Sequence, residues 1–161
     1  MRTYRNLLIP SDREAINELL ESTKVFYDFE IDVAIEIVDA FLSKGEASGY
    51  YFYVAEQDSR VTGFVNFGPT PCTKGSWDIY WIAVTKELQG HGLGADLLKM
   101  AEDKIVAKGG SKIWIETSSR PDYLSTRNFY LKAGYEQVGE LPDFYDKGDH
   151  KIIFSRQPDA S

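Results

Sequence analysis

Apolar residues recur along this chain with two periods, and each period predicts one kind of secondary structure. A spacing of three and four residues indicates amphipathic helices, and it predicts helices over 12–23, 30–44 and from the glycines near residue 92 to about 108. Runs of β-branched and aromatic residues indicate strands, which we expect over 3–9, 50–56, 60–67, 77–84, 112–117, 135–141 and 150–156. A short fourth helix is expected over 122–132.

The order of these elements, β-α-α-β-β-β-α-β-α-β-β, predicts an α/β fold with a mixed, twisted sheet of about six to seven strands and about four helices. The strands over 77–84 and 112–117 are joined through a helix, so they should be parallel. Both are nearly continuously apolar, which predicts burial on both faces. No repeat or linker-like segment divides the chain, so we expect a single domain over 1–161.

Composition narrows the function classes. The chain has 161 residues, a net charge of −7 and Cys72 as its one cysteine, so it has no internal disulfide and we expect no metal site. It lacks the basic cluster that nucleic-acid binding requires and the ~20-residue apolar run of a membrane span. It also lacks a signal-peptide pattern, so we expect a cytoplasmic protein. An acidic surface would suit a cationic partner, and it would equally serve solubility.

Three glycines at alternate positions, 90, 92 and 94, lie between a predicted strand and a predicted helix. Glycine tolerates positive φ and lets a ligand approach the backbone. The first helical N–H groups are unpaired and carry the positive end of the helix dipole, so this place suits a pyrophosphate. The alternative interpretation is a turn that only tightens the packing of strand and helix.

A dinucleotide site is a second interpretation of the same segment. Gly90-x-Gly92-x-x-Ala95 matches a degenerate dinucleotide fingerprint, and Glu116 ends the next strand where a ribose-binding acid would lie. However, the segment 85–89 separates strand from glycines, and the chain after Glu116 lacks repeated βαβ units. No Gly-Lys-Ser/Thr follows, which excludes a P-loop.

The residues around the loop resemble one family. Gln89-x-x-Gly92-x-Gly94 resembles the Gln/Arg-x-x-Gly-x-Gly/Ala signature of the GNAT superfamily of N-acetyltransferases. The segment 126–135 resembles the family's Phe-Tyr-x-x-x-Gly-Phe/Tyr ending of the fourth helix, and the predicted element order agrees along essentially the whole chain. The resemblance implies one N-acetyltransferase domain that uses acetyl-CoA and an amine acceptor, without a metal, and a possible homodimer.

The resemblance also implies how the donor binds. Backbone groups of Ile82, Ala83 and Val84 would pair with the pantetheine arm as an added strand does. The pyrophosphate and the rest of the donor would contact the loop, the start of the next helix and one fourth-helix residue: Gln89, Gly90, His91, Gly92, Leu93, Gly94, Ala95 and Asn128. The asparagine that many relatives carry seven residues before the helix tyrosine is Tyr123 here, for which we expect a packing role.

Tyr130 is implied as the general acid that protonates the departing thiolate. Transfer from a phenol of pKa ~10 to a thiolate of pKa ~8.5 is uphill by only ~2 kcal/mol, which positioning can offset. Without the resemblance, a tyrosine at this place would be interpreted as a residue that packs the helix.

Glu116 is the candidate base, because it ends the strand beside the expected donor site. Direct transfer from an alkylammonium of pKa ~10.4 to a carboxylate of pKa ~4.3 is uphill by ~8 kcal/mol. Glu116 would therefore need a raised pKa, a water relay or an amine of lowered pKa. A structural role for Glu116 is the alternative.

The leading hypothesis is acetyl transfer from acetyl-CoA to a primary amine of a small molecule or peptide by direct attack in a ternary complex. A non-catalytic acyl-CoA-binding regulatory module is the alternative. The aromatic and acidic segment 26–30 would suit an acceptor pocket or a helix junction. The polar group Asp143, Asp146, Asp149 and His150 would suit a metal, but its position around Gly148 favours a hairpin turn.

Overall fold

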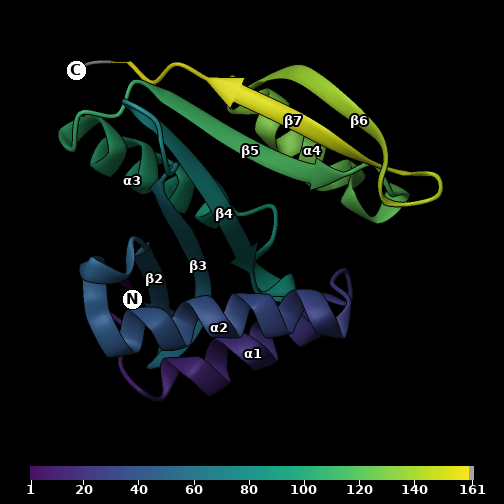
Figure 1. The fold of residues 1–161 in the computed structure, drawn as a ribbon. Coiled ribbons are helices and arrows are strands. Elements are labelled where there is room, and N and C mark those ends of the chain that lie inside the picture. The colour runs from purple at the N-terminus through teal and green to yellow at the C-terminus, as the bar shows by residue number, and fades with distance from the viewer. Residues whose placement is uncertain (160–161) are drawn as a thin grey trace.

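A mixed sheet runs through the protein (Figure 1), and the computed structural model describes residues 1–159. Its strands are β1 (Arg2–Arg5), β2 (Tyr51–Gln57), β3 (Arg60–Pro69), β4 (Ser76–Val84), β5 (Lys112–Ser118), β6 (Glu136–Asp146) and β7 (Asp149–Arg156). The helices are α1 (Asp12–Thr23), α2 (Asp28–Lys44), α3 (Leu93–Ala107) and α4 (Leu124–Lys132), with short 3-10 turns η1 (Gly45–Ser48), η2 (Lys86–Leu88) and η3 (Pro121–Tyr123). The predicted α/β class and the predicted element order are confirmed.

The strand order is β1-β2-β3-β4-β5-β7-β6. Helices α1 and α2 pack on one face, where Leu20 and Val38 share a core with Phe64. Helices α3 and α4 pack on the other face, where Leu97 and Tyr130 share a core with strand residues of both halves of the sheet. Each amphipathic helix therefore buries its apolar side against a strand surface, as the periodicity predicts.

Strands β4 and β5 are parallel, which confirms the prediction, but their pairing is short. It runs from Ser76 opposite Lys112 to Ile79 opposite Ile115. Beyond these residues the two strands diverge, β4 continuing beside β3 and β5 beside β7. Figure 1 shows β4 running toward α2 while β5 stays with β7. The sheet thus opens at the carboxyl ends of its two central strands.

The divergence corrects the prediction that both central strands are buried on both faces. Tyr80 in β4 is 39% exposed, and the side chain of Glu116 in β5 is 51% exposed. The continuous apolar pattern indicated two covered faces because it does not show where a neighbouring strand stops. Here α1 contacts β3 and β4, and the strands separate, so side chains at the opening reach solvent.

The first strand is shorter than the expected 3–9, because Asp12 accepts hydrogen bonds from Arg5 and from the segment that follows the strand. The Arg5 guanidinium donates to the Leu7 carbonyl at 2.7 Å and to both Asp12 oxygens. The Ile9 N–H also donates to Asp12, at 2.7 Å. Backbone groups after Arg5 therefore serve a turn into α1 instead of a β-ladder.

Two other boundaries differ from prediction for local reasons. Helix α2 begins at Asp28, because Glu30 reaches back to accept the Tyr27 N–H at 3.0 Å and so caps the helix. Strand β6 continues past Pro142 to Asp146, because an irregular register between Leu141 and Asp146 accommodates the proline. Within residues 1–159, no helix combines the length and apolarity needed to cross a membrane.

Candidate active site

The glycine-rich loop follows β4 and leads directly into α3. The Gln89 side chain donates to the Val84 carbonyl at 3.2 Å, which ties the loop to the end of β4. The first helical bond of α3 runs from the Asp96 N–H to the Gly92 carbonyl at 3.0 Å. The N–H groups of residues 92–95 therefore precede the first intrahelical donor and point out of the helix start. This geometry can hold an anion.

The three loop positions favour glycine for different structural reasons. Gly90 and Gly92 have φ of +79° and +83°, and a Cβ on either would meet no atom within 4 Å. Gly94 has no positive φ, but a Cβ there would lie 3.4 Å from the Phe129 ring of α4. The packing interpretation thus holds for Gly94, whereas Gly90 and Gly92 leave open space beside the helix start.

The remaining loop residues divide by exposure. His91 and Ala95 are exposed, whereas the Leu93 side chain is fully buried in the core, so only its backbone can face a ligand. Asn128 on α4 is exposed.

A β-bulge at Tyr80 interrupts β4 where the sheet opens. Phe67 pairs with Ile79 and Asn66 with Trp81, so Tyr80 has no partner on β3. The extra residue reverses the alternation of side chains. Ile79 before the bulge and Ile82 and Val84 after it all face the α3–α4 core. The sequence analysis missed this bulge, because the run 79–84 is continuously apolar and shows no alternation that a bulge would interrupt.

Past the bulge, β4 has a strand on one side only. Ile82, Ala83 and Val84 pair with Val65, Phe64 and Gly63 of β3, and β5 has already diverged. Their other backbone edge faces the opening, directly before the glycine-rich loop. Such an edge can accept an extended ligand as an added strand.

Tyr130 lies on α4 and packs into the core between α4 and the sheet. It is 4% exposed, and its ring lies 6.0 Å from that of Tyr135 and 5.9 Å from that of Phe154, between centroids. Burial raises the pKa of the Tyr130 phenol above its ordinary value. Its hydroxyl has no hydrogen-bonding partner among residues 1–159, so it is free to donate to a ligand.

Glu116 lies on the opposite face of the sheet from Tyr130. Ile115 points into the α3–α4 core, so its neighbour Glu116 points away from it. The Glu116 carboxylate accepts from the Lys151 ammonium at 2.9 Å, and Lys151 lies 3.6 Å from the Phe144 ring centroid. Glu116 and Tyr130 therefore lie on opposite faces of the sheet, without direct contact.

Asp78 and Tyr80 are site residues that the sequence analysis missed. Asp78 is half-buried on β4 and accepts from the Thr70 hydroxyl at 2.7 Å. Burial raises the pKa of the Asp78 carboxyl, and nearby Glu116 raises it further. Burial and then Asp78 raise the pKa of Tyr80 to about 12. A lone acid inside the apolar run 77–84 was the signal that could have found Asp78.

Tyr123 and the hairpin residues have structural contacts. The Tyr123 hydroxyl donates to Glu30 at 3.3 Å, and its ring packs edge-on against Phe26. In the β6–β7 hairpin, Asp143 accepts the Gly148 N–H at 2.7 Å. The predicted hairpin is thus present, and no group of three potential metal ligands occurs in the described part of the chain.

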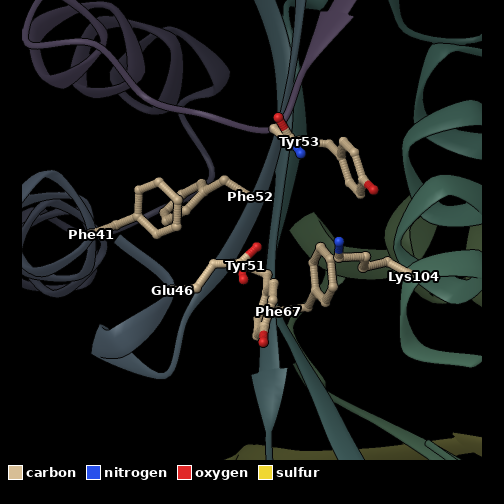
Figure 2. A pocket seen from close by; sticks show the side chains of 8 residues that line it. Phe41, Glu46, Tyr51, Phe52, Tyr53, Phe67 and Lys104 are labelled. Carbon is tan, nitrogen blue, oxygen red and sulfur yellow. The ribbon is translucent and has the colours of Figure 1, made fainter. Parts of the chain in front are cut away.

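Two hollows lie elsewhere on the molecule. The first adjoins β2 beyond the end of β1 and is too tight to hold a water molecule; Figure 2 shows Phe41 and Phe52 on the α2 side of the strand, and Tyr53 and Lys104 on the α3 side. The second is a groove of about 580 Å³ between α1 and the β2–β3 turn. Neither is lined by a residue of β5 or of the glycine-rich loop.

Comparison with known proteins decides the family. The profile of the acetyltransferase (GNAT) domain matches residues 48–137, more than half of the chain. The chain belongs to the GNAT superfamily of N-acetyltransferases. An uncharacterized N-acetyltransferase of Methanocaldococcus jannaschii is 34% identical over 110 residues, which cover 68% of each chain.

Solved structures agree. A GNAT-family acetyltransferase structure from Desulfovibrio desulfuricans superposes with a TM-score of 0.95 and 38% identity, covering 99% of this chain and 100% of that one. The structure of an aminoglycoside 6′-N-acetyltransferase complexed with coenzyme A shares the fold, with a TM-score of 0.75, 16% identity and coverage of 99% and 97%. The GNAT protein described here is thus an acetyl-CoA-dependent N-acetyltransferase, as its motifs predict.

Proposed function

We propose that this acetyltransferase transfers an acetyl group from acetyl-CoA to a primary amine of a small molecule or peptide, by direct attack in a ternary complex. One observation carries the proposal: β4 and β5 part after Ile79 and Ile115, and the free end of β4 leads through η2 into a glycine-rich loop at the start of α3. The opening admits a donor along β4, and an acceptor can approach from the face that carries Glu116.

The donor would lie along the free edge of β4. Backbone groups of Ile82, Ala83 and Val84 would pair with the pantetheine amides, and N–H groups from Gly90 to Ala95 would hold the pyrophosphate. Gln89 holds the loop on β4, whereas exposed His91 and Asn128 are free to contact the donor. Coenzyme A in the aminoglycoside enzyme supports this choice of donor.

Transfer requires one bond to form and one to break. The neutral amine attacks the thioester carbonyl, and a β4 backbone N–H near the Tyr80 bulge would stabilise the oxyanion. The tetrahedral intermediate then expels the CoA thiolate. Tyr130 would give its proton to that sulfur, because its hydroxyl makes no hydrogen bond to residues 1–159. Burial makes the phenol a weaker acid, and the same apolar surroundings would raise the pKa of the departing thiol as well.

Glu116 would accept the proton that the attacking nitrogen releases. Its contact with the Lys151 ammonium at 2.9 Å keeps the carboxylate in place. Because direct transfer from an alkylammonium is uphill by ~8 kcal/mol, we assign Glu116 to transfer through water from an amine that loses its charge as it leaves bulk solvent.

Calorimetric titration of acetyl-CoA, with NAD as the control titrant, tests the donor site. We expect micromolar binding of acetyl-CoA and none of NAD. Release of CoA is then followed with spermidine, kanamycin and an alanine-initiated hexapeptide as amines. Absence of acetyl-CoA binding would refute the assignment of the glycine-rich loop, and binding without CoA release with every amine would favour a non-catalytic acyl-CoA module.

The expected partners are acetyl-CoA and the acceptor, without nucleic acid or membrane, and the expected location is the cytoplasm. The net charge of −7 supports an amine acceptor, because it attracts cations and repels polyanions. A homodimer is also expected, and light scattering at micromolar concentration would distinguish it from a monomer.

A further inference from the structure

Arg120 lies where three elements meet beside the opening. It follows β5 by two residues and precedes η3. The other elements are the N-terminal end of β7 and the α1–α2 loop, by which we mean residues 24–30 including the first turn of α2. All three adjoin the side of the opening to which Glu116 points.

The Arg120 guanidinium is held between two aromatic rings. Its central carbon lies 4.4 Å from the Tyr27 ring centroid and 5.2 Å from that of Tyr123. One nitrogen donates to the Val25 carbonyl at 3.3 Å. The planar group therefore touches the α1–α2 loop by a stacked ring and by a backbone hydrogen bond, a combination that the ammonium of lysine cannot reproduce.

The charge of Arg120 is already neutralised by carboxylates. Glu30 lies at 3.7 Å, Asp122 at 3.6 Å and Asp149 at 3.5 Å from guanidinium nitrogens. The side chain is only 18% exposed. One guanidinium among three carboxylates gives no net positive charge that would attract an anionic substrate, so the contacts of Arg120 indicate that it joins protein elements together.

The segment that carries Arg120 is firmly attached to the sheet. The Arg127 guanidinium donates to the carbonyls of Ser118 at 2.8 Å and of Arg120 at 3.0 Å. Ser119 exchanges two hydrogen bonds with His150 of β7, its N–H donating at 2.9 Å and its hydroxyl accepting at 2.8 Å. The segment is thus the fixed partner, and the α1–α2 loop is the element that it holds.

The α1–α2 loop in turn contacts β4. Phe26 packs edge-on against Trp81 with centroids 5.1 Å apart, and Trp81 is the residue after the Tyr80 bulge. Displacement of the loop would therefore change the wall of the opening on the acceptor side. The donor side, formed by the backbone edge of residues 82–84 and the glycine-rich loop, takes part in none of these side-chain contacts.

We propose that Arg120 is a positioning residue, which clamps the α1–α2 loop onto the end of β5 and so shapes the acceptor site of the proposed reaction. The location of the acceptor rests on the proposed function, whereas the clamp itself is a property of the free protein. The two claims are tested separately.

Hydrogen–deuterium exchange of the free protein tests the clamp. Arg120→Gln and Arg120→Lys should both raise exchange in peptides covering 24–30 by roughly tenfold or more, because local opening is no longer opposed by the stacked guanidinium. Arg13→Gln is the matched control, because Arg13 also joins α1 to α2, through Asp39 at 2.7 Å, on an exposed surface. Unchanged exchange at 24–30 in both Arg120 variants would refute the clamp. If Arg120→Gln does not fold, the exchange of Arg120→Lys alone decides the test.

Kinetics test the consequence for the acceptor. With whichever of the three amines gives the highest turnover, both Arg120 variants should raise the amine KM about tenfold, with acetyl-CoA affinity unchanged in calorimetry. Raised exchange with an unchanged amine KM would refute the positioning role and leave only a structural clamp. A protein that turns over no amine would refute the proposed reaction, while the exchange result would still decide the clamp.

Discussion

Replacement of Tyr130 by phenylalanine should separate catalysis from stability. The variant removes one hydroxyl, which has no hydrogen-bonding partner among residues 1–159, and keeps the ring that packs against Tyr135 and Phe154. The cavity it leaves is smaller than a water molecule. We therefore expect a folded enzyme whose turnover falls because the thiolate must leave without its proton donor.

The expected magnitudes follow from these contacts. Loss of a general acid with a good leaving group should lower turnover ~10- to 100-fold, equal to ~1.4–2.7 kcal/mol of activation free energy. Loss of an unpaired hydroxyl should change the free energy of unfolding by less than about 1 kcal/mol. That corresponds to a change in Tm within about 2–4 °C.

Tyr135→Phe is the matched control, because Tyr135 is the adjacent buried tyrosine with the opposite set of contacts. Its hydroxyl donates at 2.8 Å to Glu102, a buried carboxylate that Arg156 also contacts at 2.8 Å. Loss of a hydrogen bond to a charged group costs about 1.5–3 kcal/mol, so Tm should fall by roughly 3–12 °C. Turnover of the folded fraction should stay near that of the parent.

A thiol-reactive dye follows CoA release, and calorimetry follows acetyl-CoA binding. Cys72 is exposed and reacts once with the dye, so it is titrated before acetyl-CoA is added. Equal turnover of Tyr130→Phe and the parent would remove Tyr130 from the mechanism. A larger loss of Tm in Tyr130→Phe than in Tyr135→Phe would show that its role is structural.

Three further predictions concern the loop and the acids. Gly92→Ala should lower the free energy of unfolding by about 1–2 kcal/mol, because residue 92 has a φ of +83°, and should weaken acetyl-CoA binding in calorimetry; parent values for both would contradict the role given to the loop. Glu116→Gln should lower turnover about tenfold or more, yet leave Tm within ~2 °C because the Glu116 side chain is half-exposed and the glutamine amide oxygen can still accept from Lys151; undiminished turnover would exclude it as the base. Asp78→Asn should raise the free energy of unfolding measured in urea near pH 7, and the gain should shrink as the pH falls toward 3.8, because burial raises the pKa of Asp78 in the folded state and so destabilises its ionised form; a gain that persists at low pH would show that charge is not its cause.

The sequence alone was sufficient for features that depend on neighbours along the chain. Helical periodicity placed α1, α2 and α3, and the glycines marked the start of α3, because these signals are local dihedral preferences and one-sided apolar spacing. The family signature from Gln89 to Gly94 rests on the same kind of local requirement: a turn with positive φ that leads into a helix. Family, fold class and the parallel central pair were therefore predictable.

Features that depend on where strands part were not predictable. The apolar run of β4 indicated two covered faces, but β5 leaves it after Ile79, and only the three-dimensional path of both strands determines that point. The Tyr80 bulge is a mismatch of register between β3 and β4, so neither strand specifies it alone.

Contacts between distant charged groups were also outside the reach of the sequence. The pairing of Glu116 with Lys151 and the clamp of Arg120 on Tyr27 join residues that are 35 and 93 positions apart. No local preference selects such partners; they meet because the sheet brings β7 beside β5 and brings the α1–α2 loop to the end of β5. The sequence determined which chemistry the chain carries, and the tertiary structure decided which side chains stand together at the opening to perform it.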